Sequence, residues 1–258
     1  MMTETSISNA KPAGLIFGAT GGIGSALARR LAAAGWRLAL SGRNAEPLEK
    51  LGRETSALTQ LAEATVAGEV ESVFEKALDK FGRLDGVVNC CGSLLLKSAH
   101  LTTDDEWART LAANLTTSFV ILRAAAARMM RSGGGSIVLM SSAVAQRGMI
   151  NHEAIAAAKA GVAGLAQSAG ATYARFNIRI NCVAPGLTRT PLAEPITRNE
   201  ASLKASAALH PLGRIGEPNE VASAIAWLLD PEQKWVTGQT IGVDGGLASI
   251  QARPTPSA

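Results

Sequence analysis

Seven residues with four glycines, 18–24 (GATGGIG), constrain the fold of this chain more than any other segment. The apolar run Ala13–Phe17 precedes them, and the Ala- and Leu-rich run Ser25–Ala34, which predicts a helix, follows them. Glycine is needed where a Cβ would collide with a bound phosphate or with the strand, and such a turn presents backbone N–H groups and a helix N-terminus to an anion. The segment therefore predicts a pyrophosphate-binding turn, because four glycines in seven residues disfavour an ordinary strand–helix turn.

Short apolar runs alternate with helical patterns along the rest of the chain. Strands are predicted at Trp36–Leu40, Gln60–Thr65, Gly86–Cys90, Ser136–Met140, Ile178–Val183 and Gln239–Val243. Helices are predicted at Glu46–Leu58, Glu69–Phe81, Thr103–Arg131 (as two stretches), Glu153–Arg175 and Pro218–Leu229. This alternation predicts an α/β fold, a doubly wound parallel sheet with helices on both faces.

We assign residues 13–250 to one domain, because no internal repeat, linker or change of composition divides them. Residues 1–12 and the Pro- and Ser-rich residues 251–258 are expected to be flexible tails. Residues 185–212 carry no periodic pattern, and a long irregular segment in a compact domain usually serves binding. We expect the part of this segment from about residue 187 to residue 212 to form a mobile lid over the substrate. Its apolar side chains (Leu187, Leu192 and Ile196) favour a hydrophobic substrate.

Charge and cysteine content argue against several classes of protein. The formal net charge is only +4, with no long basic run, so no nucleic-acid partner is expected. Three cysteines, Cys90, Cys91 and Cys182, suggest neither a disulfide framework nor a zinc site, which predicts a reducing, cytoplasmic compartment and no metal. Residues 1–12 lack a signal-peptide core, and no uncharged apolar run reaches about 18 residues, so no membrane partner is expected.

Several motifs resemble those of the short-chain dehydrogenase/reductase family. The spacing Gly18-x-x-x-Gly22-x-Gly24 resembles this family rather than the G-x-G-x-x-G of longer dehydrogenases. The other matches follow in the family's order between Ala13 and Gly246: Asn89-Cys90-Cys91-Gly92, Asn114, Ser142, Lys159, Asn181–Gly186, Thr237-Gly238 and Asp244–Gly246. The resemblance implies a single-domain Rossmann fold and hydride transfer between a nicotinamide dinucleotide and a carbonyl or alcohol carbon.

The resemblance also implies a set of cofactor-binding residues: Gly18, Thr20, Gly22, Ile23, Gly24, Arg43, Glu63, Asn89, Gly92, Lys159, Pro185, Gly186, Thr188 and Thr190. Arg43 follows the predicted strand Trp36–Leu40, where an acid would hold the ribose of NAD and a basic residue accommodates the 2′-phosphate of NADP. We therefore expect NADP(H), because a guanidinium binds phosphate in two places; a plain surface arginine is the alternative. NAD stays open as a second cofactor, since Gly21 stands where many NADP-dependent members carry another basic residue.

The set of residues that the family uses for proton transfer is incomplete in this sequence. The resemblance implies that Lys159 holds the nicotinamide ribose, that Ser142 polarises the substrate oxygen and that Asn114 supports a proton path; a helix cap is the alternative for Asn114. Family members carry the proton-donating tyrosine four residues before the lysine, where this chain has Ile155. The only tyrosine, Tyr173, lies farther along the same predicted helix at a position that the family fills with a core residue.

One histidine could take the place of the missing tyrosine. His152, Ile155 and Lys159 share one stripe of the predicted helix. An imidazole changes charge near neutral pH, which suits a general acid or base. We therefore hypothesise that His152 is the proton donor, and a helix-start or pocket residue without a catalytic role is the alternative.

The remaining candidates have structural explanations. We expect His100 and His210 to be surface residues of loops, and Cys90 and Cys91 to be small packing residues. The helices 104–131 and 153–175 carry many alanines that we expect to face away from the sheet. In the family the counterparts of these helices pack across a dimer axis, which implies a homodimer or homotetramer.

Two functions remain open at this stage. The first is an NADP(H)-dependent oxidoreductase with an atypical proton donor, acting on a small carbonyl or alcohol substrate. The second is a non-catalytic NADP(H)-binding protein that serves as a sensor or regulatory partner. The loss of tyrosine at Ile155 favours the second, and the retention of Ser142, Lys159 and Asn114 favours the first. Loss of a general acid typically costs about 10²–10⁴-fold in rate without abolishing hydride transfer, so we favour the enzyme.

Overall fold

Seven parallel strands form one sheet in the order β3-β2-β1-β4-β5-β6-β7 in the computed structural model, which describes residues 11–251. The strands are β1 (Ala13–Phe17), β2 (Arg37–Gly42), β3 (Leu58–Leu61), β4 (Gly86–Asn89), β5 (Gly135–Met140), β6 (Ile178–Pro185) and β7 (Thr240–Val243). The order reverses between β1 and β4, and in open α/β sheets a ligand binds at the carboxyl ends of the strands at such a reversal. The predicted α/β fold is confirmed.

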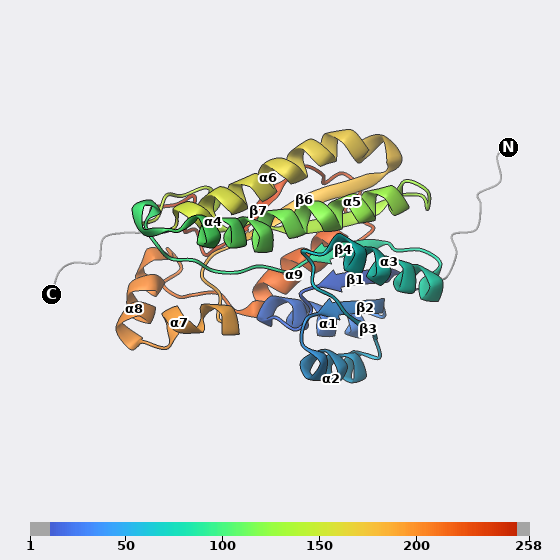
Figure 1. Cartoon of the computed structure of the whole chain (residues 1–258), viewed down its shortest axis with the longest axis horizontal. Helices are drawn as coiled ribbons and strands as arrows, with labels where there is room; N and C mark the ends of the chain where they lie inside the picture. Colours follow the sequence, from blue (N-terminus) through green and yellow to red (C-terminus); the bar gives the residue numbers. More distant parts are fainter. Residues whose placement is uncertain (1–10, 252–258) are drawn as a thin grey trace.

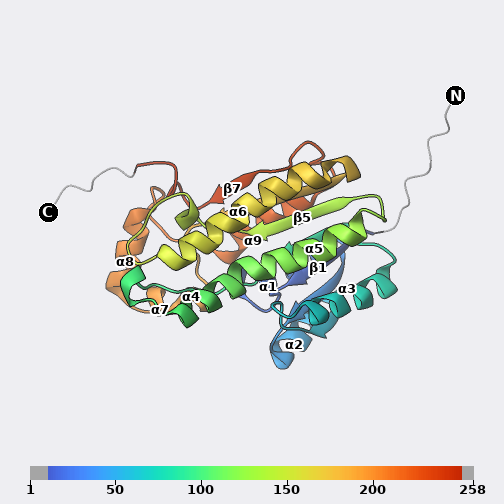
Figure 2. The same cartoon turned by 45° about the horizontal axis from the view of Figure 1, so that its top comes forward.

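Helices cover both faces of this sheet (Figures 1 and 2). They are α1 (Gly22–Ala33), α2 (Ala45–Thr55), α3 (Ala67–Phe81), α4 (Asp104–Leu111), α5 (Thr117–Met129), α6 (Glu153–Tyr173), α7 (Glu194–Thr197), α8 (Glu200–Leu209) and α9 (Pro218–Leu229). One core cluster joins the sheet to α3, α5 and α6, and a second joins it to α1, α2 and α9. All five residues of β1 are buried, as expected for a strand covered on both faces.

The edge strand differs most from its predicted position. The apolar pattern predicts a strand at Gln60–Thr65, whereas β3 is Leu58–Leu61. The preceding helix ends at Ser56, whose left-handed backbone (φ 53°) turns the chain early enough for Leu58 to pair with Ala39 of β2. The strand has one neighbour only, and Leu61 is half exposed, so its bounds depend on pairing rather than on hydrophobic pattern.

The segment predicted to be irregular contains helices. Residues 185–212 include the two lid helices α7 and α8, so the prediction of an irregular segment is wrong in part. None of the residues of α8 is buried, and a helix without a buried face lacks the periodic apolar stripe that reveals helices in a sequence. These helices lie together at one end of the molecule, beside the start of α4 (Figure 1).

The helical stretch Asp104–Met129 is long and apolar enough to cross a membrane by length and composition. More than half of its apolar window is buried inside the domain, as in the core helix of a globular protein. Ala124 and Ala125 of α5 belong to the core cluster that joins the sheet to α3, α5 and α6, so the expectation that the alanines of this stretch face away from the sheet is wrong for these two. Their small side chains allow the helix to approach the strands closely.

The predicted tails lie mostly outside the described residues. Residues 1–10 and 252–258 are not among those that the structure describes, so the proposed domain limits at 13 and 250 stay predictions.

Candidate active site

The glycine turn lies at the carboxyl end of β1, beside the strand-order reversal. Gly18 has a left-handed backbone (φ 68°), and a Cβ there would lie 2.7 Å from the backbone of Cys90 and Cys91. A Cβ on Gly24 would collide with the carbonyl oxygen of Gly18. Both glycines are therefore required by close approach of backbone to backbone, before any ligand is considered.

The start of α1 offers a place for a pyrophosphate. The helix has no side-chain cap and no acidic residue in its first turn, and within residues 11–251 no acceptor is found for the amides of Gly22, Ile23 and Gly24. Unpartnered amides at a helix N-terminus bind anions well. Thr20 lies partly buried at this turn, with its Oγ1 3.3 Å from where a Cβ on Gly42 would be. These groups fit the phosphates of a dinucleotide.

Arg43 and Glu63 lie at the adjoining ends of β2 and β3. Arg43 is 74% exposed, and its Nη1 lies 3.6 Å from the Glu63 carboxylate. An exposed ion pair of this length contributes little to stability, so it leaves the guanidinium available to a ligand.

Lys159 lies buried in α6, where its Nζ donates a 2.9 Å hydrogen bond to the carbonyl oxygen of Met140. Burial lowers the pKa of Lys159 from its ordinary 10.5 to about 8, since the interior disfavours the charged ammonium. The lysine backbone is fixed in turn, because Ser141 Oγ donates to the Lys159 carbonyl at 2.9 Å. The ammonium is thus held in place at the end of β5.

The side chains of Lys159 and Asn114 both lie next to Gly92. A Cβ on Gly92 would lie 3.0 Å from Asn114 Oδ1 and 3.5 Å from Lys159 Nζ. Asn114 is fully buried in a π-helical turn, 112–116, which joins α4 to α5; such turns occur often at functional sites. Its side chain bonds to Ser93 and to the Thr110 carbonyl, so it is an interior residue and not a helix cap.

Asn89 holds the chain that follows β4. Its Oδ1 accepts from the Cys91 amide at 2.9 Å, and its Nδ2 donates to Ser118 Oγ at 3.0 Å. The side chain is buried, with its hydrogen bonds inside the protein. Asn89 is therefore placed to shape the loop that reaches Gly92.

A cavity of about 400 Å³ lies between these residues and the lid. Ser142, His152, Ile155 and Lys159 all line it. Ser142 Oγ donates a 3.4 Å hydrogen bond to the Pro185 carbonyl, and Ile155 is buried one helical turn before Lys159. His152 precedes α6 and is partly exposed; its Nδ1 lies 2.7 Å from the Ile150 carbonyl oxygen, which makes Nδ1 the donor, and Nε2 has no hydrogen-bond partner among residues 11–251.

The turn after β6 carries the remaining predicted residues to the same cavity. Pro185, Gly186, Thr188 and Thr190 line it, and Thr188 Oγ1 donates to the Gly186 carbonyl at 3.1 Å. Thr190 reaches the glycine turn, since a Cβ on Gly22 would lie 2.6 Å from Thr190 Cγ2.

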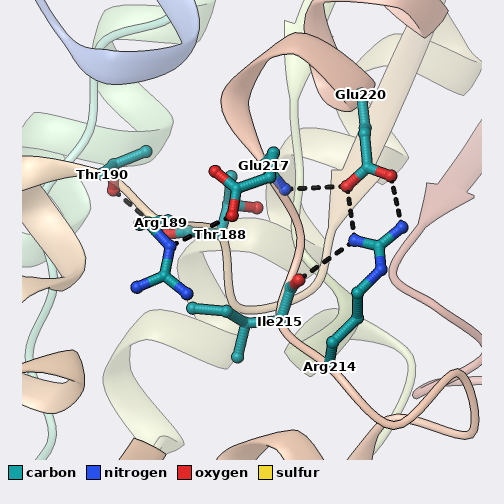
Figure 3. Close-up of polar contacts among 7 residues, drawn as sticks. All are labelled: Thr188, Arg189, Thr190, Arg214, Ile215, Glu217 and Glu220. Carbon is teal, nitrogen blue, oxygen red and sulfur yellow. Dashed lines mark hydrogen bonds and ion pairs between the residues drawn. The ribbon is translucent and has the colours of Figure 1, made fainter.

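The two ends of the lid are joined below this turn (Figure 3). Thr188 forms a parallel bridge with Gly216, and the Arg189 amide donates to the Gly216 carbonyl at 2.9 Å. Arg189 pairs with Glu217 at 3.0 Å, and Arg214 binds Glu220 through both guanidinium nitrogens. The hydrogen bonds from Arg214 are the main reason that the pKa of Glu220 falls to about 2. The base of the lid is therefore held by the backbone hydrogen bonds of Gly216 to Leu187 and Arg189, and the exposed ion pairs add little.

Comparison with known proteins identifies the family. A family model described as enoyl-(acyl carrier protein) reductase matches residues 18–248. The 3-oxoacyl-[acyl-carrier-protein] reductase FabG of Thermotoga maritima is 35% identical over 240 residues, which cover 90% of this chain and 96% of that protein. The chain belongs to the short-chain dehydrogenase/reductase family.

Other members of the family match over nearly the same length. Nodulation protein G of Rhizobium sp. (strain N33) is 37% identical over 238 residues, covering 92% of this chain and 96% of that protein. A crystal structure of an actinorhodin polyketide ketoreductase variant with NADPH superposes with a TM-score of 0.89 at 28% identity, covering 93% of this chain and 98% of that one. This short-chain dehydrogenase/reductase is therefore an oxidoreductase of small molecules that binds a nicotinamide dinucleotide.

The structure of this family member corrects the prediction for one histidine. His210 was expected on the surface and is instead 3% exposed, with both ring nitrogens bonded to backbone atoms and the ring lining the cavity. His100 is exposed, as expected. Sequence reasoning missed His210 because it follows a helix with no apolar stripe, and no local pattern marks it as buried.

Burial shifts the pKa values of the cysteine thiols. Burial raises the pKa of Cys90, Cys91 and Cys182 to about 12 each, so these thiols stay protonated and unreactive near neutral pH. Within residues 11–251 no group of three or more His, Cys, Asp or Glu side chains is gathered as a metal site.

Proposed function

We propose that this protein is an NADP(H)-dependent oxidoreductase in which His152 exchanges the proton that other members exchange through tyrosine. Its substrate is a small, neutral and largely apolar carbonyl compound or the corresponding alcohol. The bound nicotinamide supplies or accepts the hydride, and the chain's own side chains do the rest.

The placement of His152 carries the proposal. With its Nδ1–H bonded to the Ile150 carbonyl, the ring presents Nε2 as its other polar atom, and the ring lines the cavity that Ser142 and Ile155 also line. In carbonyl reduction, the imidazolium Nε2–H donates its proton to the substrate oxygen while the carbonyl carbon receives the hydride. The neutral imidazole then regains a proton from water, since His152 is partly exposed.

The other polar groups bind and orient. Ser142 Oγ is proposed to donate a hydrogen bond to the substrate oxygen, exchanging its long 3.4 Å bond to Pro185 for that contact. Lys159 Nζ is proposed to bind the hydroxyls of the nicotinamide ribose, for which its remaining protons are available beyond the bond to Met140.

The preference for NADP(H) rests on Arg43. Its guanidinium is exposed at the end of β2 and held only by the 3.6 Å pair with Glu63, so a 2′-phosphate could replace that carboxylate as its partner. The NADPH bound by the related polyketide ketoreductase supports the same choice.

The cavity favours a neutral, apolar substrate. Apolar side chains contributed by the lid (Leu187, Leu192, Ile196 and Leu209) line it, and within residues 11–251 the wall carries no arginine, aspartate or glutamate. Its two cations have other proposed partners, because Lys159 binds the ribose and protonated His152 donates to the substrate oxygen. A carboxylate or phosphate elsewhere on the substrate would therefore lose its hydration against apolar side chains. The related cyclohexanol dehydrogenase of Acinetobacter sp. (strain SE19), 35% identical over 241 residues, is consistent with such a substrate.

The test follows NADPH oxidation by the purified protein. Neutral cyclic ketones are compared with 2-oxo acids of similar size, and we expect turnover with the former. His152→Ala is expected to reduce kcat by about 10²–10⁴-fold with NADPH binding unchanged, whereas the exposed control His100→Ala should retain full activity. Unchanged turnover in His152→Ala refutes the proton donor. No turnover by the natural sequence, with activity appearing only in Ile155→Tyr, indicates a cofactor-binding protein without chemistry.

We also propose that the chain forms a homodimer or homotetramer. Trp107 of α4 and Phe119 of α5 are 43% and 47% exposed, and α4, α5 and α6 lie side by side on one face (Figure 2). Light scattering at micromolar concentration is expected to give a multiple of the chain mass, and Phe119→Glu is expected to lower it. A monomer in both cases contradicts this proposal.

A further inference from the structure

His210 connects two segments that are far apart along the lid. Its Nδ1 lies 2.7 Å from the Ser206 carbonyl in the last turn of α8, and its Nε2 accepts from the Leu187 amide at 3.2 Å. Carbonyl oxygens only accept and amides only donate, so the ring is the neutral tautomer with its proton on Nδ1. The imidazole therefore bridges the end of α8 and the turn that follows β6.

Gly186 makes room for this ring. A Cβ on Gly186 would lie 2.8 Å from His210 Nε2, and Gly245 packs against the other side of the residue, where a Cβ would be in ordinary contact at 3.6 Å from the His210 Cβ. The ring is 3% exposed as a result. Both hydrogen bonds are therefore shielded from water, where a lost partner is costly.

Little else holds α8 to the rest of the domain. None of its residues is buried, and within residues 11–251 none of its side chains forms a hydrogen bond or ion pair with another element. The base of the lid is fixed by the parallel bridge between Thr188 and Gly216, and the exposed Arg189–Glu217 and Arg214–Glu220 pairs lie beside it (Figure 3). None of these contacts at the base involves α8.

We propose that His210 is a positioning residue that holds α8 against the Pro185–Thr188 turn and so fixes the wall of the substrate cavity. Ser206 and Leu209, at the end of α8, form part of that wall beside His210 itself. The substrate thereby meets a preformed surface, and less binding energy is lost in ordering the lid. The effect on substrate KM rests on the proposed function, whereas the effect on the motion of α8 does not.

Three variants separate the two bonds. His210→Phe keeps the ring and loses both bonds. His210→Asn keeps a polar atom near the position of Nδ1 and loses the acceptor for Leu187, whereas His210→Gln can return an acceptor near the position of Nε2. His100→Ala is the control for the loss of a histidine that is exposed.

The first readout is amide hydrogen exchange of residues 201–209 in the cofactor-free protein. We expect exchange to be about tenfold faster in His210→Asn, the factor given by one lost buried hydrogen bond, and faster still in His210→Phe, which loses both bonds. Exchange should stay within about twofold of the natural protein in His210→Gln. The second readout is steady-state kinetics, in which KM for the ketone should rise about tenfold in the first two variants with kcat within about threefold.

The outcomes are distinguishable from failure of the proposed function. If the natural protein has no turnover, the proposed function fails and the exchange rates alone decide the role of His210. Unchanged exchange of α8 in His210→Phe and His210→Asn overturns the proposal, and so does fast exchange in His210→Gln. A change of thermal stability without faster exchange of α8 also overturns it, because it would indicate a role only in the core.

Discussion

Replacing Lys159 by methionine should make the protein more stable at neutral pH while removing the residue that we propose binds the nicotinamide ribose. The pKa of Lys159 is about 8 in the folded chain, against 10.5 ordinarily, because its ammonium is buried. Between these two values the unfolded chain binds more protons than the folded one, so stability rises with pH across this window. The full cost of burying the charge is therefore present below pH 8 and is lost as pH approaches 10.5.

The magnitude follows from the two pKa values. Their difference corresponds to ~3 kcal/mol of unfavourable burial at pH 7. Methionine keeps the unbranched stem but leaves the Met140 carbonyl without its 2.9 Å partner, which costs about 1 kcal/mol. Lys159→Met should therefore be ~2 kcal/mol more stable than the natural protein at pH 7 and about equal to it near pH 10.

Urea denaturation of both proteins at several pH values between 7 and 10 measures this difference. Burial raises the pKa of the three cysteines from 9.0 to about 12, so both proteins become less stable above pH 9 as the thiols of the unfolded chain ionise. The Lys159 charge lowers these thiol pKa values, so their effect differs between the two proteins and the comparison is read mainly between pH 7 and 9. Stability curves that run parallel across this range would show that the Lys159 ammonium is not desolvated, and the reasoning would be refuted.

Three further predictions test the cofactor turn, the nucleotide preference and the thiols. Gly24→Ala should destabilise the protein by about 2 kcal/mol or more in urea denaturation, because its Cβ would collide with the Gly18 backbone; Gly68→Ala, with open space around it, should be nearly neutral, and equal effects would contradict this. Arg43→Ala should raise KM for NADPH about tenfold and leave KM for NADH nearly unchanged, and an equal rise for both would remove the role of its guanidinium. Iodoacetamide near pH 8 should alkylate the native protein far more slowly than the urea-unfolded protein, since Cys182 is buried, Cys90 and Cys91 are partly buried and all three thiols have a pKa of about 12; mass spectrometry counts the labels, and rapid labelling of Cys182 in the native protein would refute this.

Local sequence was sufficient where the structure depends on sterics and periodicity over a few residues. The glycine turn at 18–24 could be predicted because a strand, a glycine-rich segment and a helical pattern are adjacent, and the structure shows backbone contacts at Gly18 and Gly24 that exclude a side chain. The buried strands could be predicted because both of their faces are apolar. The departure at Ile155 also needs only sequence, since it depends on the spacing to Lys159 and on the presence of a single tyrosine elsewhere.

Tertiary structure alone decided which distant residues meet. Gly92, Asn114 and Lys159 come from a loop, a π-helical turn and a long helix, and no spacing between them predicts that they converge. The same holds for His210, which is buried where Gly186, far from it in the sequence, leaves room for its ring. Periodicity reports which face of an element is apolar, but the partner of that face is set by how the layers pack; contacts across layers are therefore absent from any local pattern.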